Sequence, residues 1–171
     1  MEKLIRLENN LNSIDELQTI STLQSVNSDL ITMIIGKKIG SGTYRAVYQH
    51  NWDKNWVIKI EPSSTNCNVA EFMLWDEIQG LKNELAWVKE WFAPILFMSP
   101  NGKILCMQKT SEYPKNKKLE RPKQIPEFFT DVKWDNFGWI GNRFVCHDYG
   151  FIHKFIKYEK KLQTVRKDIA W

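Results

Sequence analysis

Apolar and polar residues alternate with two different periods along the chain, and the period predicts the type of each element. Apolar residues three and four positions apart indicate helices, whereas short runs of β-branched and aromatic residues between turn-forming residues indicate strands. Helical spacing covers residues 2–11, 13–25, 69–92 and 151–167, and a short helix is expected at 126–129. Strands are expected at 30–39, 44–50, 56–60 and 143–146.

Local turn signals divide these runs. Gly80 predicts a break within the helical stretch 69–92. Asn101-Gly102 separates two apolar runs, 93–100 and 103–110, and this dipeptide is a strong hairpin signal. Helices followed by a mostly antiparallel sheet with one inserted helical unit, and then by a small end of loops and helix, predict an α+β fold.

Composition narrows the class of protein. Hydrophobic residues make up 43% and charged residues 26% of 171 residues, which is typical of one globular domain and excludes a disordered chain. A formal charge of +4 permits phosphate-bearing partners without indicating nucleic acid. Cys67, Cys106 and Cys146 form no C-x-x-C pair, and Cys106 and Cys146 lie inside apolar runs, where we expect reduced, buried thiols. The charged N-terminus is no secretory signal and no run is long enough to span a membrane, so we expect a soluble, cytoplasmic protein.

A glycine-rich turn is the first candidate for chemistry. Gly40-Ser41-Gly42 lies between two expected strands, where glycines let backbone N–H groups approach phosphate oxygens. Arg45 stands where the pattern G-x-G-x-x-G has its third glycine. No Gly-Lys-Ser/Thr follows, so this is not a Walker loop, and the segment alone is equally compatible with a plain hairpin turn.

Lys59 and Glu71 form the second candidate. Lys59 lies among β-branched residues one strand after the glycine turn, where it is either a solvated charge on an edge strand or a phosphate ligand. Glu71 is expected either to pair with Lys59 or, three residues after Asn68 as N-cap, to complete a capping arrangement. Glu77 is the next candidate on the same helix for pairing with Lys59.

Two acidic motifs carry the most specific signal. The segment from Asp131 to Asn136 (DVKWDN) matches D-x-K-x-x-N, and Asp148-Tyr149-Gly150 follows twelve residues after Asn136. Together with the glycine turn and Lys59 upstream, this order resembles the protein-kinase family, and above all small kinase-like proteins encoded by phages. The resemblance spans residues 36–150.

The resemblance implies ATP and Mg²⁺ as cofactors and a role for each matching residue. The residues implied in catalysis are Asp131 (proton acceptor), Lys133 (γ-phosphate), Lys59 (α- and β-phosphates) and Glu71 (partner of Lys59). The implied metal ligands are Asn136 and Asp148. The implied nucleotide-binding residues are Gly40, Ser41, Gly42, Val47, Val57, Lys59, Met107, Gln108 and Lys109.

The resemblance also implies a domain division. Residues 1–29 would form an N-terminal helical extension, and 30–171 a truncated kinase-like domain. Its antiparallel N-lobe would cover 30–110 and its much reduced C-lobe 111–171.

The sequence departs from the family in two places. The histidine and arginine that precede the catalytic aspartate are replaced by Phe129 and Thr130. The twenty-one residues after Gly150 leave no room for a long activation segment and a peptide-binding platform. We therefore expect a minimal Ser/Thr-type kinase acting on a protein substrate. The alternatives are a kinase-shaped protein that binds and inhibits a host partner, and a small-molecule phosphotransferase; a homodimer would supply the missing substrate surface.

Three further features are expected to be structural. The basic connector at 113–123 is predicted to be solvated. Trp75, Trp87 and Trp91 fall near helical spacing and are predicted to pack in the core. His147, next to Asp148, has no second histidine or cysteine at ligand spacing, so no zinc site is expected.

Overall fold

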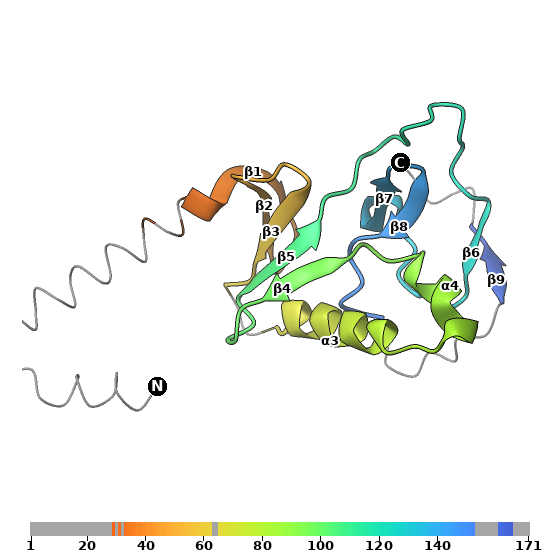
Figure 1. The fold of residues 1–171 in the computed structure, drawn as a ribbon, viewed down its shortest axis with the longest axis horizontal. Helices are drawn as coiled ribbons and strands as arrows, with labels where there is room; N and C mark the ends of the chain where they lie inside the picture. The colour runs from red at the N-terminus through yellow and green to blue at the C-terminus, as the bar shows by residue number, and fades with distance from the viewer. Residues whose placement is uncertain (1–28, 30, 32, 63–64, 153–160, 166–171) are drawn as a thin grey trace, which may run out of the picture.

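A five-stranded antiparallel sheet forms the N-terminal part of the described chain (Figure 1). The computed structural model describes residues 29, 31, 33–62, 65–152 and 161–165. The strands lie in the order β1-β2-β3-β5-β4. Their bounds are Ile35–Ser41 (β1), Ala46–His50 (β2), Trp56–Ile60 (β3), Ile95–Met98 (β4) and Ile104–Gln108 (β5). The predicted α+β class with an antiparallel sheet is confirmed.

Helix α3 (Cys67–Gln79) lies along the sheet beside β4 (Figure 1). Its buried face carries Asn68, Glu71, Leu74 and Ile78, whose spacing of three and four residues places them on one side of the helix. The predicted break at Gly80 is present, and after it come a 3₁₀ turn, η1 (Asn83–Leu85), and the short helix α4 (Ala86–Lys89). None of the helices in the described ranges is long and apolar enough to cross a membrane.

The start of α3 differs from the prediction. Asn66, not Asn68, is the N-cap residue, and it makes no side-chain capping bond. The carboxylate of Glu61 instead accepts hydrogen bonds from the backbone N–H groups of Cys67 (3.2 Å) and Asn68 (2.8 Å) and from the Thr65 hydroxyl (2.5 Å). A residue just past β3 therefore caps the helix that follows, because free N–H groups of a first turn need acceptors.

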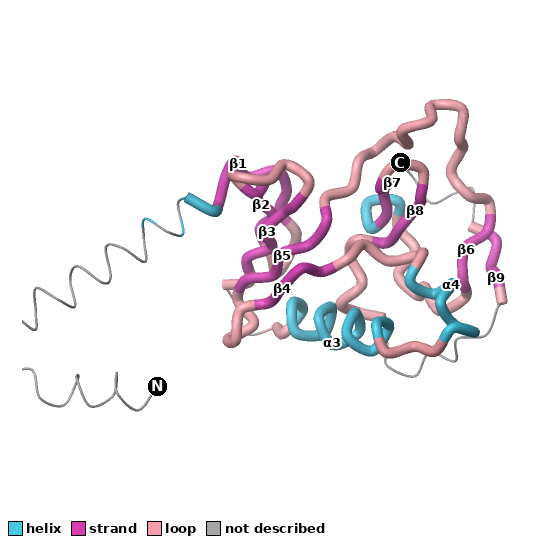
Figure 2. Tube along the Cα trace, in the orientation of Figure 1, coloured by secondary structure: helices cyan, strands magenta, loops and turns pink. Residues whose placement is uncertain are grey.

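The C-terminal part consists mostly of loops and two small hairpin-like pairs (Figure 2). A 3₁₀ turn, η2 (Trp134–Asn136), leads into β7 (Phe137–Ile140), which pairs with β8 (Arg143–Cys146). Strand β6 (Gln124–Pro126) pairs with β9 (Leu162–Thr164).

Several predicted elements were wrong or incomplete. Residues 124–126 form a strand where a short helix was expected at 126–129, and residues 162–164 form a strand inside the expected helix 151–167. Strand β7 was not predicted, and β1 begins later than expected because residues 33–34 are helical. The expected helices at 2–11 and 13–25 lie outside the described residues.

The β7–β8 hairpin is joined to the larger sheet on both sides. On one side the N–H groups of Ala93 and Cys146 donate to Cys146 and Trp91, both at 2.8 Å. On the other side Ser111 and Trp139 exchange two backbone hydrogen bonds of 2.9 and 2.8 Å. Residues 91–93 precede β4 and residue 111 follows β5, so these bonds fix the hairpin against the ends of the sheet strands.

An aromatic cluster fills the space beneath this hairpin. Phe92 packs on Phe129 with ring centroids 5.3 Å apart and on Tyr149 at 5.1 Å, and Phe129 packs on Phe137 at 5.1 Å. Trp75, Trp87 and Trp91 pack against this core, as predicted. The three cysteines are buried and unpaired, which confirms the prediction for Cys106 and Cys146.

We predict that Glu61→Ala lowers the free energy of unfolding by roughly 2 kcal/mol, because it leaves buried N–H groups at the start of α3 without an acceptor. Urea denaturation followed by tryptophan fluorescence measures this change. Asp76→Ala on the exposed face of α3 is the matched control and should change stability by less than about 0.5 kcal/mol. Equal losses in both variants would contradict a capping role for Glu61.

Candidate functional site

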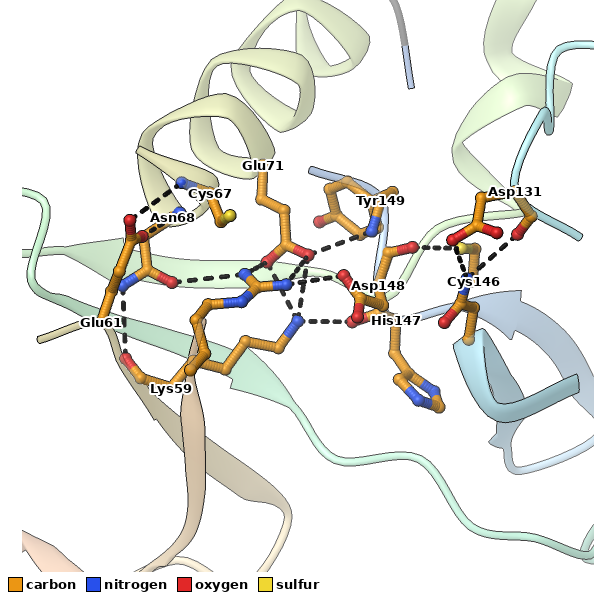
Figure 3. A network of polar contacts seen from close by, with 12 residues as sticks. Lys59, Glu61, Cys67, Asn68, Glu71, Asp131, Cys146, His147, Asp148 and Tyr149 are labelled. Atoms are coloured by element: carbon orange, nitrogen blue, oxygen red, sulfur yellow. Dashed lines mark hydrogen bonds and ion pairs between the residues drawn. The ribbon is translucent and has the colours of Figure 1, made fainter. Parts of the chain in front are cut away.

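The side chain of Lys59 points from β3 toward α3 and meets Glu71 (Figure 3). Its Nζ lies 3.1 and 3.0 Å from the two carboxylate oxygens of Glu71 and donates to the carbonyl of His147 at 2.5 Å. Lys59 is 5% exposed and Glu71 is fully buried, so neither is a solvated surface charge. The pairing of these residues predicted from the sequence is present.

The period of the strand explains this meeting. Side chains two residues apart on a strand share a face, so Lys59 and Glu61 point to the same side of the sheet. Glu61 holds the first turn of α3 there, and Glu71 lies one turn further along the helix. The alternation of side chains along this strand therefore places both Glu61, which caps α3, and Lys59, which pairs with Glu71, on the side that faces the helix.

Arg45 adds a second cation to the same carboxylate. It follows the glycine turn, and its guanidinium donates to Glu71 at 2.8 and 3.0 Å, to Asn68 at 3.3 Å and to Asp148 at 2.6 Å. From the sequence, Arg45 was notable only because it replaces the third glycine of the pattern G-x-G-x-x-G. A buried arginine one residue before a strand gives no local signal of its partners, because those partners are 23 to 103 residues away in the chain.

The Asp148-Tyr149-Gly150 segment lies against the same helix. The N–H of Tyr149 donates to Glu71 at 3.0 Å, and the buried Tyr149 hydroxyl donates to the carbonyl of Ala93 at 2.9 Å. A Cβ at Gly150 would lie 3.0 Å from the carbonyl oxygen of Cys67, so a side chain here would press on the first turn of α3. The Asp148 side chain is 44% exposed beside Arg45.

Burial and charge shift the pKa values of these groups in opposite directions. Burial alone would raise the pKa of Glu71, but Lys59 and Arg45 outweigh it and hold the value at about 2. Burial lowers the pKa of Lys59, an effect that Glu71 opposes. Burial raises the pKa of Asp148, although Lys59 and Arg45 oppose the shift. Glu71 is therefore the firmly ionised carboxylate of the group.

Asp131, Lys133 and Asn136 form a second cluster. Lys133 Nζ lies 2.9 Å from Asp131 Oδ1, and this contact raises the pKa of Lys133. Asn136 Nδ2 donates to the backbone carbonyl of Asp131 at 3.0 Å and to its carboxylate at 3.1 Å. The amide oxygen of Asn136 therefore points away from Asp131. The carboxylate of Asp131 and the ammonium of Lys133 are both solvent-exposed.

The β7–β8 hairpin brings the two clusters together. The N–H of His147 donates to the carbonyl of Asn136 at 2.8 Å, so the residues before β7 lie beside those after β8. The backbone carbonyl of His147 also accepts a hydrogen bond from the ammonium group of Lys59. One chain of direct contacts thus connects Lys59 through His147 to Asn136 and Asp131, and Figure 3 shows Asp131 and Asp148 in one view with Lys59.

The predicted nucleotide-binding residues Gly40, Ser41, Gly42 and Val47 lie at the end of edge strand β1, in the turn after it and on β2. Gly40 and Ser41 end β1, and Gly42 donates its N–H to the carbonyl of Arg45 at 2.8 Å to close a tight turn. Val47 pairs with Gly40 on β1 and with Lys59 on β3. These residues follow one another across the sheet toward the Lys59–Glu71 pair.

The end of β5 offers fewer free groups than the resemblance implies. Val57 pairs with Met107, which is fully buried. The N–H of Gln108 donates to the carbonyl of Pro94 at 2.8 Å, and the N–H of Lys109 donates to the carbonyl of Asn55 at 2.7 Å. A ligand at this strand end cannot receive hydrogen bonds from these two N–H groups while they are so engaged.

A pocket of about 330 Å³ opens beside this strand end. The residues that line it come from the segment after β5, the connector, η2, β7 and the residue after β8: Thr110, Ser111, Glu112, Arg121, Trp134, Asp135, Phe137 and His147. Arg121 lies over the ring of Trp134 at 5.1 Å from its centroid. These eight residues come from separate parts of the sequence, and only the hairpin and the connector bring them together.

His147 forms the wall between the pocket and the ion-pair network. Its Nε2 lies 2.9 Å from the carbonyl oxygen of Asp135, which can only accept, so Nε2 carries the proton and Nδ1 accepts from the Thr110 hydroxyl at 2.9 Å. Burial, together with nearby Lys59, lowers the pKa of His147 to about 4. The imidazole is therefore neutral at pH 7.

Comparison of the chain with protein-family models and with curated proteins gave no match. Within the described ranges, no group of three or more His, Cys, Asp or Glu side chains is placed to hold a metal ion.

We predict strong energetic coupling between Lys59 and Glu71. Lys59→Met and Glu71→Gln should each lower the free energy of unfolding by about 3 kcal/mol, and the double variant should lose at least about 1 kcal/mol less than the sum. Chemical denaturation of the four proteins measures the coupling. The exposed pair of Arg143 and Glu90, 3.1 Å apart, is the control, with expected coupling below about 1 kcal/mol. Additive losses at Lys59 and Glu71 would contradict a direct interaction.

We also predict a pH dependence from His147. Its pKa falls from 6.5 to about 4 on folding, so the neutral form is favoured in the folded state. The contribution of His147 to the free energy of unfolding is therefore greatest above pH 6.5. It decreases as the pH falls toward 4, by roughly 3 kcal/mol at most. The difference in unfolding free energy between wild type and His147→Gln, measured from pH 7.5 to 4, isolates this contribution. Parallel curves for the two proteins would contradict it.

Proposed function

We propose that the protein is a Mg-ATP-dependent phosphotransferase of the protein-kinase type, with a minimal kinase-like fold and Ser/Thr hydroxyl groups of a protein as acceptor. In this proposal the five-stranded sheet with α3 corresponds to the N-lobe, and residues 111–171 to a reduced C-lobe. A cytoplasmic setting and a host protein as substrate, for a phage-encoded kinase, belong to the same proposal.

One observation carries the proposal: the two distant motifs converge. Lys59 pairs with Glu71 and donates a hydrogen bond to the backbone carbonyl of His147. His147 directly precedes Asp148 in the sequence, and its N–H donates to the carbonyl of Asn136. Residues 59, 71, 136 and 148 are held within one connected network although up to 89 positions separate them in the sequence. Such an arrangement is what phosphoryl transfer requires, because positioning and charge neutralisation provide most of its rate.

The donor set fits ATP with Mg²⁺. Mg²⁺ prefers oxygen ligands, and the exposed carboxylate of Asp148 and the amide oxygen of Asn136 would supply one carboxylate and one amide oxygen. When bound, Mg²⁺ would neutralise charge on the phosphate oxygens. Lys59 would hold the α- and β-phosphates in the orientation that Glu71 fixes, and Lys133 would stabilise charge on the transferred group.

Asp131 would orient the acceptor hydroxyl and take its proton. Its carboxylate is exposed, which gives an external substrate access, and Asn136 and Lys133 fix its direction. The pocket next to β5 would hold the base and sugar of the nucleotide. Trp134 and Phe137 provide apolar surface there, and Glu112 and Asp135 provide acceptors for hydroxyl groups.

The contact of Arg45 with Asp148 favours a second candidate, a kinase-shaped protein that binds and inhibits a host partner. A guanidinium 2.6 Å from Asp148 Oδ1 competes with a metal for that carboxylate. In this alternative transfer is slow or absent, and partner binding does not depend on Asp131.

We predict that Asp131→Asn lowers phosphate transfer by two to four orders of magnitude, the range typical of a lost general base, while ATP binding persists. Radiolabelled ATP with casein as acceptor, and separately with a panel of small alcohols, measures the rate and distinguishes a protein kinase from a small-molecule phosphotransferase.

Asp148→Asn should remove the magnesium-dependent part of the thermal stabilisation by ATP, which at a hundredfold excess over the dissociation constant is about 2.7 kcal/mol in the wild type. Asp76→Asn on α3 is the control and should behave as the wild type. Transfer that survives in both Asp131→Asn and Asp148→Asn would refute the proposed roles. Absence of transfer by the wild type, with host proteins captured equally by wild type and Asp131→Asn, would support the binding protein instead.

A further inference from the structure

We propose that Arg45 is a metal-sensitive latch: its guanidinium ties the glycine turn to Glu71 and Asp148, and a divalent metal bound with nucleotide takes Asp148 from it. This inference rests on the proposed function, in which Asp148 is a metal ligand.

The geometry of Arg45 links three separate parts of the site. The guanidinium belongs to the turn between β1 and β2, Glu71 belongs to α3, and Asp148 follows β8. Arg45 contacts Glu71 at 2.8 Å and Asp148 at 2.6 Å, and its side chain is only 9% exposed. Both terminal nitrogens are engaged, so the planar group spans the two carboxylates at once.

Glu71 does not need Arg45 for its neutralisation. Lys59 already reaches both oxygens of Glu71 and is itself buried beside it. The distinctive contact of Arg45 is therefore the one with Asp148, whose side chain is far more exposed than Glu71. Asp148 is the member of the network that a metal can approach from solvent.

A divalent metal and the guanidinium cannot both bind Asp148 closely without mutual repulsion. Two positive centres within a few ångströms repel each other strongly where water is partly excluded. The phosphates of a bound nucleotide offer Arg45 new acceptors at the moment that the metal takes Asp148. The exchange replaces one charge-assisted contact by another, and the glycine turn moves with the arginine.

The turn is built to move as a unit. The hydrogen bond from Gly42 N–H to the Arg45 carbonyl closes it, and residues 41–44 are exposed, so a shift of the turn uncovers no core. The exposed ring of Tyr44 lies 6.2 Å from that of Phe151, which gives the turn a second, weak attachment on the segment after Gly150.

Binding of Mn²⁺ in the presence of the non-hydrolysable nucleotide AMP-PNP tests the latch. Free Mn²⁺ is measured by electron paramagnetic resonance for wild type, Arg45→Gln, Arg45→Lys and Lys38→Gln. Arg45→Gln should lower the half-saturating Mn²⁺ concentration by about tenfold, because no cation competes for Asp148. Arg45→Lys keeps a charge but cannot span two carboxylates, so its value should lie between those of Arg45→Gln and wild type.

Lys38→Gln removes the same charge from an exposed position on β1 and should match the wild type. Because Arg45→Gln leaves two carboxylates with one buried cation, cooperative unfolding of each variant is checked first, and Arg45→Lys decides the question where Arg45→Gln does not fold.

Half-saturation at equal or higher Mn²⁺ concentration in the Arg45 variants overturns the latch and leaves the proposed function standing, since Arg45 would then act as a permanent phosphate ligand. Failure of wild type and all variants to bind Mn²⁺ and AMP-PNP overturns both the latch and the proposed function.

Discussion

The buried carboxylate of Glu71 is the interaction on which the site depends. It accepts from Lys59 on β3, from Arg45 after the glycine turn and from the N–H of Tyr149 beyond β8, while its own backbone belongs to α3. An ionised carboxylate without partners in such a place would cost several kcal/mol. The hydrogen bonds and ion pairs that compensate the buried charge of Glu71 therefore hold all four segments in position.

A buried ion-pair network is a poor way to gain stability, since well-packed apolar residues often do as well. What the network provides instead is geometric selectivity. The two cations at Glu71 hold the glycine turn, β3 and the Asp148 segment in the arrangement described, because hydrogen bonds to a carboxylate are directional.

Sequence patterns predicted the elements whose residues interact with near neighbours. The antiparallel strands around Lys59, the break at Gly80 and the turn at Asn101-Gly102 depend on local propensity and on period, so they were visible in the chain. The pairing of Lys59 with Glu71 was also predictable, because strand and helix are adjacent in sequence and the motif order suggested it.

Elements that depend on distant partners were not predictable in the same way. Strand β6 is three residues long and exists through its pairing with β9, some forty positions away, so no period distinguishes it. Strand β7 contains Gly138, which weakens a strand signal, yet a Cβ there would come within 2.7 Å of Thr110. The capping by Glu61 and the contacts of Arg45 follow from the tertiary structure, and a single sequence holds no trace of them.

The position of Asp131 illustrates how a polar site can rest on apolar packing. Two residues earlier, Phe129 is almost fully buried and packs on Phe92 and Phe137. The ring of Phe129 packs edge-to-face on Phe137 and at a tilt on Phe92, and these contacts hold the backbone segment in place. Phe129 thereby anchors one side of the loop, and Asn136 binds Asp131 from the other. An exposed carboxylate held between two such points keeps its direction, so a small chain can keep a precise polar cluster with little scaffold around it.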